Sequence, residues 1–282
     1  MPDAQHVTIV TDSTADVPPD MREALEIEVV PLRVNFGQES FRDGIGLTTA
    51  QLMERMANAP SLPTTSQPTA GEFAAVFQDA IDAGREVVCI TIGAKLSGTY
   101  QAAVTAAEQV ALDRIEVIDG ATTTMHIGWP AVAGARVARQ GADRETVSRT
   151  IRDARERSNL FVALKTLDNV YKGGRIGKAS QLVGSALGIK PIVSFRDGTL
   201  VPIERVRTWK KAVRRMVELV VEEGDLSDII VVYTDDPTDA ETIQAELREH
   251  YPNANVILGT AGAVIATHAG PGAIGVATLR RA

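Results

Sequence analysis

The chain is poor in cysteine, with Cys89 as the only one among 282 residues. A single thiol cannot form an intramolecular disulfide or a zinc site built from several cysteines. Cys89 lies in an apolar run at residues 86–93. We therefore expect it to be a buried and inert thiol.

Aromatic side chains and positive charge are also scarce. Phe, Trp and Tyr make up 4% of the residues, and 36 Asp and Glu outnumber 29 Lys and Arg, which gives a net charge of −7. Nucleic-acid binding depends on clustered Lys and Arg and, for single strands, on stacking aromatic rings. The composition therefore excludes a general nucleic-acid-binding protein.

The chain has no apolar run near the roughly 20 residues of a membrane span. Its N-terminal residues show neither the basic region nor the long apolar region of a secretory signal. No zinc-protease, EF-hand or paired zinc-ligand motif occurs. We expect a cytoplasmic protein that does not span the membrane and needs no metal or cofactor.

Short β-branched runs alternate with longer Ala-, Glu- and Arg-rich stretches of helical spacing, which indicates an α/β fold with a largely parallel sheet. The predicted strands are residues 7–11, 29–36, 87–92, 115–119, 160–165, 229–234 and 256–258. The predicted helices are residues 48–59, 69–83, 97–112, 122–140, 143–158, 209–223 and 239–250.

The C-terminal part does not show the same alternation of strands and helices throughout. An Asp197-Gly198 pair between two apolar runs predicts a hairpin, and residues 260–279 suggest further strands. We therefore predict two domains. The first, residues 1–158, has a doubly wound parallel sheet, and the second, residues 159–282, is a mixed or antiparallel α/β domain.

The first candidate site is a run of hydroxyls before a helix. Thr69 and Glu72 have the spacing of a capping box, so a helix begins there. Thr65 and Ser66 lie just upstream, near the positive end of that helix, where hydroxyls and free N–H groups can hold a small anion. Ordinary turn chemistry is the alternative.

The second candidate is Ser97-Gly98-Thr99, which follows a predicted strand and opens a helix. Open α/β sheets bind ligands at this position, and a glycine lets a ligand approach the backbone. The alternative is that Ser97 only caps the helix. Ser97 does not lie in a G-x-S-x-G nucleophile motif.

Two glycine-rich stretches remain. Gly270, Gly272 and Gly275 have dinucleotide-motif spacing, but no helix or ribose-binding acid can follow them so near the C-terminus. What remains there is His268, which we place in a glycine-rich loop open to a polar ligand. The turn at 172–178 fails the P-loop spacing, and we interpret it as a solvated basic turn that carries Arg175.

Several motifs together resemble the DegV family of bacterial fatty-acid-binding proteins. The resemblance spans residues 7–276 and rests on six motifs in family order: Val10–Thr14, Thr65–Pro68, Leu96–Gln101, Lys172–Ile176, Gly188–Pro191 and His268–Gly272. It implies two α/β domains with a long-chain fatty acid, such as palmitate, in a tunnel between them. It also implies a carrier role for a separate ATP-binding fatty acid kinase subunit, which phosphorylates the bound carboxylate.

The resemblance also implies roles for individual residues. Thr65 and Ser97 match the hydroxyls that hold the carboxylate, and His268 matches the imidazole beside it. Ser66, Gly98 and Thr99 complete the expected ligand-binding set. Arg175 matches an arginine that faces the kinase subunit, and either Arg205 or Arg207 falls near the head group.

We therefore expect a lipid carrier with no catalytic residues of its own. A hydroxyl and an imidazole are also the parts of a serine hydrolase or acyl transferase, which would use Ser97 and His268. That is the alternative function, although no acid partner with motif support accompanies them.

Overall fold

The computed structural model describes residues 6–182 and 188–282. The chain forms two compact units. The first unit comprises Met1–Arg33 and Ser66–Glu156, and the second comprises Val34–Thr65 and Arg157–Ala282. The unit boundary at residues 156 and 157 lies close to the predicted boundary at 158, but residues 34–65, which we expected in the first domain, belong to the second unit.

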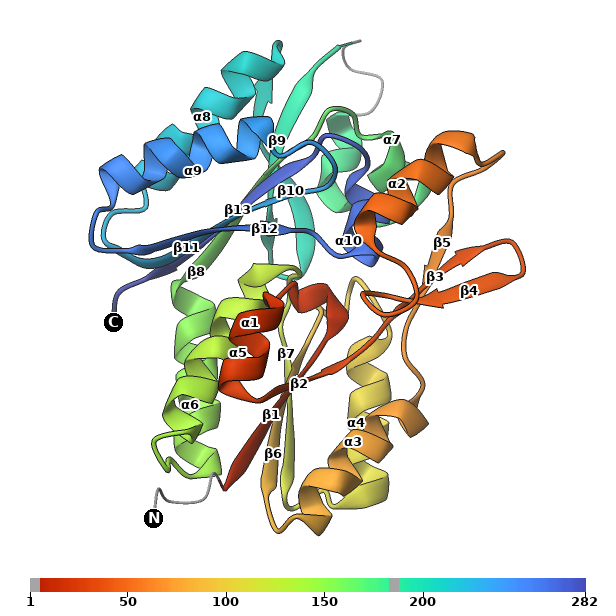
Figure 1. Ribbon diagram of the computed structural model, residues 1–282, viewed down its shortest axis with the longest axis vertical. Coiled ribbons are helices and arrows are strands. Elements are labelled where there is room, and N and C mark those ends of the chain that lie inside the picture. Colours follow the sequence, from red (N-terminus) through yellow and green to blue (C-terminus); the bar gives the residue numbers. More distant parts are fainter. Residues whose placement is uncertain (1–5, 183–187) are drawn as a thin grey trace. The chain divides into compact units, whose positions relative to one another are not determined.

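The first unit is built on a four-stranded parallel sheet of order β2-β1-β6-β7. Helices lie on both faces of this sheet, with α3 and α4 on one face and α1, α5 and α6 on the other (Figure 1). The strands are β1 (Val7–Asp12), β2 (Ile27–Val30), β6 (Glu86–Thr91) and β7 (Ile115–Asp119). The helices are η1 (Ser13–Ala15), α1 (Pro19–Leu25), α3 (Ala70–Asp82), α4 (Thr99–Val110), α5 (Met125–Ala138) and α6 (Arg144–Arg157).

Side-chain size explains how this sheet is covered. Phe73 and Phe77 of α3 are fully buried against the sheet, while α4 presents small alanines such as Ala103 to the same core. Cys89 of β6 is also fully buried, as expected. Burial, together with the nearby charge of Asp12, raises the pKa of the Cys89 thiol well above its usual value, so it stays protonated and unreactive.

The second unit contains a three-stranded sheet of order β4-β3-β5, followed along the chain by a six-stranded mixed sheet. The small sheet is formed by β3 (Arg33–Phe36), β4 (Glu39–Arg42) and β5 (Thr64–Ser66), with α2 (Thr49–Asn58) between β4 and β5. Residues 29–36, predicted as one strand, are in fact two strands in different sheets. Pro31 interrupts the run because it lacks a backbone N–H for a sheet hydrogen bond.

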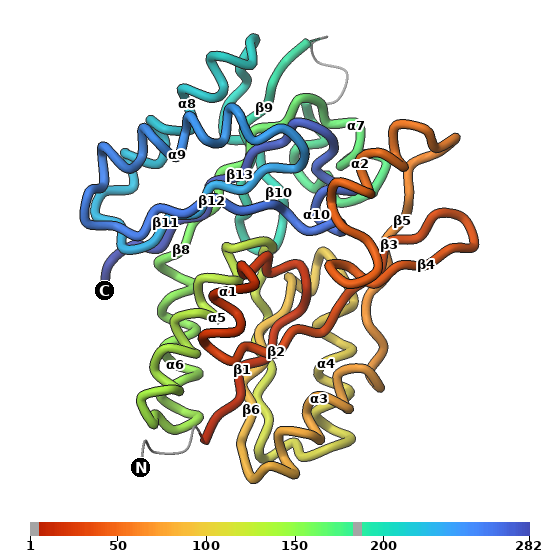
Figure 2. The backbone as a smooth tube through the Cα atoms, viewed as in Figure 1, coloured from red at the N-terminus to blue at the C-terminus, as the bar shows by residue number. Residues whose placement is uncertain are grey.

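The six-stranded sheet has the order β10-β9-β8-β13-β11-β12, and only β11 and β12 pair in parallel. Its strands are β8 (Ser158–Ala163), β9 (Lys190–Arg196), β10 (Thr199–Val206), β11 (Leu226–Tyr233), β12 (Asn255–Thr260) and β13 (Ile274–Arg280). Its helices are α7 (Asp168–Lys172), η2 (Gly177–Leu182), α8 (Trp209–Val221), α9 (Thr238–His250) and α10 (Ala263–Ala269). Figure 2 traces α8 and α9 running together along this sheet, and both contribute to one core with it.

The predicted mixed sheet and its hairpin are confirmed. Asp197 and Gly198 connect β9 to β10 with positive φ values of 52° and 72°, as a two-residue turn of type I′ requires. The C-terminal stretch was only partly predicted, since β13 is a strand but residues 263–269 form the short helix α10.

Residues 34–65 join the second unit through hydrogen bonds to the start of α10. The Thr49 hydroxyl donates to the Ala261 carbonyl at 2.6 Å, and the Ala263 N–H donates to Asp43 Oδ1 at 2.8 Å. Both bonds are buried, and they span more than 200 residues of sequence. Within residues 6–182 and 188–282, none of the helices has the length and apolar character needed to cross a membrane.

Candidate functional site

The second unit brings Thr65 and His268 together. Thr65 lies on β5, and His268 lies in the last turn of α10. Thr65 Oγ1 and His268 Nε2 are 2.9 Å apart, which is a hydrogen bond. We expected His268 in a loop, and this was wrong: residues 263–269 form the helix α10, which ends at Gly270 with a φ of 78°.

The environment of His268 keeps its imidazole neutral. Burial, together with the positive charge of Arg175, lowers its pKa from 6.5 to about 4. Near neutral pH the ring therefore carries one N–H and one acceptor nitrogen. Such a ring is a weak base and does not act as a cation toward a bound anion.

The hydrogen-bond pattern assigns the tautomer. Nδ1 of His268 is buried and has no hydrogen-bond partner among the described residues. A hydrogen on Nδ1 would thus be a buried donor without an acceptor, which is costly. We assign the hydrogen to Nε2, which then donates to Thr65 Oγ1. The hydrogen of the Thr65 hydroxyl is left to donate to another acceptor.

Arg175 lies close to this pair. Its Nη1 donates to the carbonyl of Gly173 at 2.8 Å, and its charge acts on His268. Arg175 itself is exposed, as are Lys172 and Lys178. The basic turn is therefore solvated on its outer side, as expected, but its Gly173 packs against His268.

The first unit holds the other predicted residues. The hydroxyls of Ser97 and Thr99 are 2.9 Å apart, and the Thr99 N–H donates weakly to Ser97 Oγ at 3.4 Å. The N-cap position of α4 is Gly98, so Ser97 lies one residue before the N-cap and is not itself the N-cap residue. Ser97 is half-buried and Thr99 is buried.

A connection within the first unit that the sequence did not reveal joins Gln67 to this turn. A Cβ on Gly98 would lie 2.0 Å from Gln67 Oε1, so the Gln67 amide occupies the space that the missing side chain leaves. Ser66, which precedes Gln67, is half-buried. Gln67 lies within the Thr65–Pro68 motif, but that motif gave no role to its side chain.

Arg205 and Arg207 are exposed, at the end of β10 and just after it. No hydrogen bond or ion pair joins either one to Thr65 or His268 in the described part of the second unit. Their role near a head group stays a prediction.

The surroundings of His268 do not favour a hydrolase. In a catalytic triad a carboxylate accepts from Nδ1 of the histidine and orients it. The Nδ1 of His268 has no such partner among the described residues. The same residues contain no group of three or more His, Cys, Asp or Glu side chains arranged to hold a metal ion.

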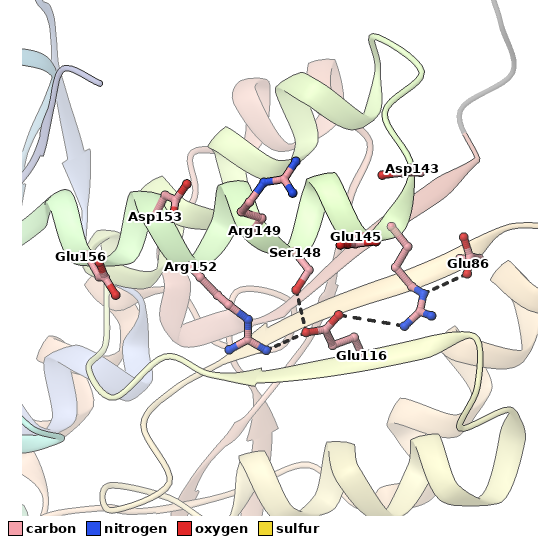
Figure 3. A pocket seen from close by; sticks show the side chains of 10 residues that line it. Glu86, Glu116, Asp143, Glu145, Ser148, Arg149, Arg152, Asp153 and Glu156 are labelled. Carbon is pink, nitrogen blue, oxygen red and sulfur yellow. Dashed lines mark hydrogen bonds and ion pairs between the residues drawn. The ribbon is translucent and has the colours of Figure 1, made fainter.

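A charged groove of about 770 Å³ lies along α6 in the first unit (Figure 3). Glu116 accepts from Arg152 and from Ser148, each at 2.6 Å, and Arg144 pairs with Glu86 at 2.9 Å. Burial opposes the ionisation of Glu116, but these hydrogen bonds outweigh it and hold the pKa of Glu116 below its usual value. The central charges of the groove thus satisfy one another, and we assign it no ligand.

Comparisons with known proteins identify the family. A family model described as an uncharacterised protein of the DegV family matches residues 6–281. A DegV domain-containing protein of Halalkalibacterium halodurans is 38% identical over 277 residues, which cover 96% of this chain and 97% of that protein.

Two solved structures are similar over nearly the whole chain. One, described as fatty acid binding of a DegV family protein from Thermus thermophilus, has a TM-score of 0.92 and 30% identity, and covers 98% of this chain and 100% of its own. The other, a stearic acid-binding protein from Eubacterium ventriosum, has a TM-score of 0.89 and 27% identity, and covers 97% and 98%. With the α/β fold and the motifs described above, these matches show that the chain belongs to the DegV family.

Proposed function

We propose that this protein binds one long-chain fatty acid and holds its carboxylate with the Thr65 hydroxyl. The observation that carries the proposal is the hydrogen bond between Thr65 Oγ1 and His268 Nε2. Because the imidazole donates to Thr65 Oγ1, the hydroxyl hydrogen is available to a different acceptor. A carboxylate is an acceptor only and suits this donor.

The acyl chain supplies most of the affinity. Burying hydrocarbon contributes about 0.8 kcal/mol per CH₂, so a C16 tail contributes on the order of 10 kcal/mol before ordering costs. The carboxylate loses water on binding and opposes association unless it is hydrogen-bonded. The tail therefore sets the affinity, and the head site sets the orientation. The tunnel expected for the tail stays a prediction.

Ser97 is the second proposed carboxylate ligand. Its hydroxyl already pairs with the Thr99 hydroxyl, and one of these two groups still has a hydrogen to donate. Ser66, Gly98 and Thr99 belong to the same proposal as neighbours of the two hydroxyls. Two structures of nearly full-length similarity, one of a fatty acid-binding DegV family protein and one of a stearic acid-binding protein, support this assignment of ligand class.

The proposed role of the bound acid is to be presented to a separate ATP-binding kinase subunit. There, a carboxylate oxygen would attack the γ-phosphorus of ATP, the bond to the β-phosphate oxygen would break, and an acyl phosphate and ADP would result. Such a transfer needs a phosphate cradle and metal-binding acids. We propose that the partner brings both, and that the isolated chain is not an enzyme.

Native mass spectrometry of the delipidated protein tests this function. Palmitic and stearic acid should each give a one-to-one adduct. Methyl palmitate keeps the tail but lacks the anionic head, and it should bind more weakly. The absence of an adduct with both acids would overturn the proposal. Turnover of ester substrates by the isolated chain, lost in Ser97→Ala, would favour the hydrolase instead.

A further inference from the structure

Two segments of the second unit fit together at three successive points. A Cβ on Gly272 would lie 2.7 Å from Lys165 Cε, and one on Gly270 would lie 2.9 Å from Asn169 Cγ. A Cβ on Gly173 would lie 2.3 Å from His268 Nδ1. The contacting residues are four apart along 165–173 and two apart along 268–272, and the two segments run in opposite directions. Residues 165–173 therefore pack against the end of α10 and the residues that follow it.

Asn169 fixes the backbone next to His268. Its amide Nδ2 donates to the carbonyl of Thr267 at 3.0 Å, in a buried hydrogen bond. The carbonyl of Asn169 accepts from the Gly173 N–H at 2.8 Å. One residue thus holds both the backbone that carries the imidazole and the glycine against which the imidazole packs.

The two adjacent glycines of this turn are needed for different reasons. Gly174 has a φ of 73° and open space where a Cβ would stand, so it serves the turn conformation. Gly173 has a φ of −73° and a ψ of −8°, a conformation open to any residue. The main obstacle to a side chain at Gly173 is the His268 ring, whose Nδ1 would lie 2.3 Å from a Cβ, whereas the Asn169 carbonyl oxygen would lie at 3.0 Å. A methyl group there would push the ring away.

We propose that Gly173, supported by Asn169, is a positioning residue that keeps the His268 imidazole within hydrogen-bond reach of Thr65. The ring is held on both sides, with Nε2 bound to Thr65 Oγ1 and Nδ1 facing the bare Cα of Gly173. The expected effect on fatty acid affinity rests on the proposed function. The effect on the position of the imidazole does not depend on that function.

A double-variant experiment separates these two effects. We would compare Gly173→Ala, His268→Ala and the combination, with Gly174→Ala as the control for general damage to the turn. The measurements are the urea midpoint of unfolding, the NMR signals of the His268 imidazole, and the affinity of the delipidated protein for palmitic acid.

Gly173→Ala should lower the urea midpoint and shift the His268 signals, and it should weaken palmitic acid binding at least fivefold. In the His268→Ala background, the same change should have little effect on the midpoint and none on affinity. Gly174→Ala should lower the midpoint through backbone strain but leave the imidazole signals in place. If Gly173→Ala alone does not fold, recovery of folding in the combination supports the proposal.

If Gly173→Ala lowers stability equally in the parent and in the His268→Ala protein, the positioning role is wrong. An unchanged imidazole spectrum in a folded Gly173→Ala protein would also overturn it. If the imidazole moves and the stability effects are coupled, but palmitic acid binds equally well to all variants, the positioning role stands. The proposed function of the Thr65–His268 pair would then be wrong.

Discussion

Thr65 and His268 are 203 residues apart in the chain, yet Oγ1 and Nε2 lie 2.9 Å from each other in the second unit. The pairing joins a three-residue edge strand to the last turn of a seven-residue helix. Neither element is stable alone, so the geometry of the pair depends on the packing of residues 34–65 against α10. The threonine hydroxyl is the group of this pair that keeps a hydrogen to donate, because the imidazole is neutral and already donates to it.

Thr65→Val tests that hydroxyl with little change in shape. Valine keeps the β-branched shape and removes the hydroxyl, which is both the proposed donor to the carboxylate and the acceptor for His268 Nε2–H. Palmitic acid binding should weaken by about 1–3 kcal/mol, the typical cost of losing a hydrogen bond to a charged group, as measured by calorimetry. Thr65→Ser keeps the hydroxyl and should bind nearly as the parent does. Equal affinity of the valine and serine variants would place the carboxylate elsewhere.

Ser97→Ala should also weaken palmitic acid binding, by about 1–3 kcal/mol. Its cost in unfolding free energy should be about 1 kcal/mol, which comes mainly from the lost 2.9 Å bond to the buried Thr99 hydroxyl, since the bond from the Thr99 N–H is long, at 3.4 Å. Calorimetry of Ser97→Ala, Thr65→Ala and the double variant tests whether both hydroxyls bind one ligand. Unchanged affinity in the double variant would mean that neither hydroxyl belongs to the head site.

Local patterns in the sequence predicted most of the regular structure. The capping box forms as expected, with the Thr69 N–H donating to Glu72 at 2.9 Å and the Glu72 N–H donating to Thr69 Oγ1 at 3.2 Å. The Asp197-Gly198 turn and the buried strands of the first unit were likewise predictable from the sequence. Each of these features depends on residues that are close together in the chain.

The missed features depend on distant contacts. Helix α10 is seven residues long, too short for a clear helical period, and it follows strand-like residues. Residues 34–65 join the second unit through Thr49 and Asp43, whose partners lie more than 200 residues away. Asn169 lies outside every motif and Gln67 lies inside Thr65–Pro68 without an expected role, since the importance of each comes from the backbone that it approaches.

The low pKa of His268 predicts a pH dependence of stability. In the unfolded chain the imidazole titrates near 6.5, whereas burial, helped by Arg175, lowers the pKa to about 4 in the folded protein. Between these values the unfolded state binds the proton and the folded state does not, so stability falls as the pH drops from 6.5 toward 4. Above 6.5 both states are neutral and the effect vanishes.

Urea unfolding of the parent and of His268→Ala, each from pH 7.5 to 5, isolates this contribution. The difference in unfolding free energy between the two proteins should shrink by about 1.4 kcal/mol per pH unit below 6.5. A difference that stays constant over this range would show that His268 titrates normally in the folded protein.

Arg175→Glu distinguishes a partner contact from a ligand contact. Arg175 is exposed and bonded to the Gly173 carbonyl, so its reversal should leave the fold intact. Exposed charges at the rim of an interface steer association, and we expect this one to meet an acidic surface of the kinase subunit. The variant should bind palmitic acid with near-parental affinity, yet acyl phosphate formation with an added kinase subunit should be lost.

Lys178→Glu makes the same charge change in the same turn and serves as the matched control, with an expected smaller loss. Loss of palmitic acid binding in folded Arg175→Glu would instead indicate that Arg175 contacts the ligand. Because the charge of Arg175 acts on His268, its reversal should raise the pKa of that imidazole, and an NMR titration would detect this change. Weakened binding would then assign Arg175 to the head site, and the docking role of the basic turn would be discarded.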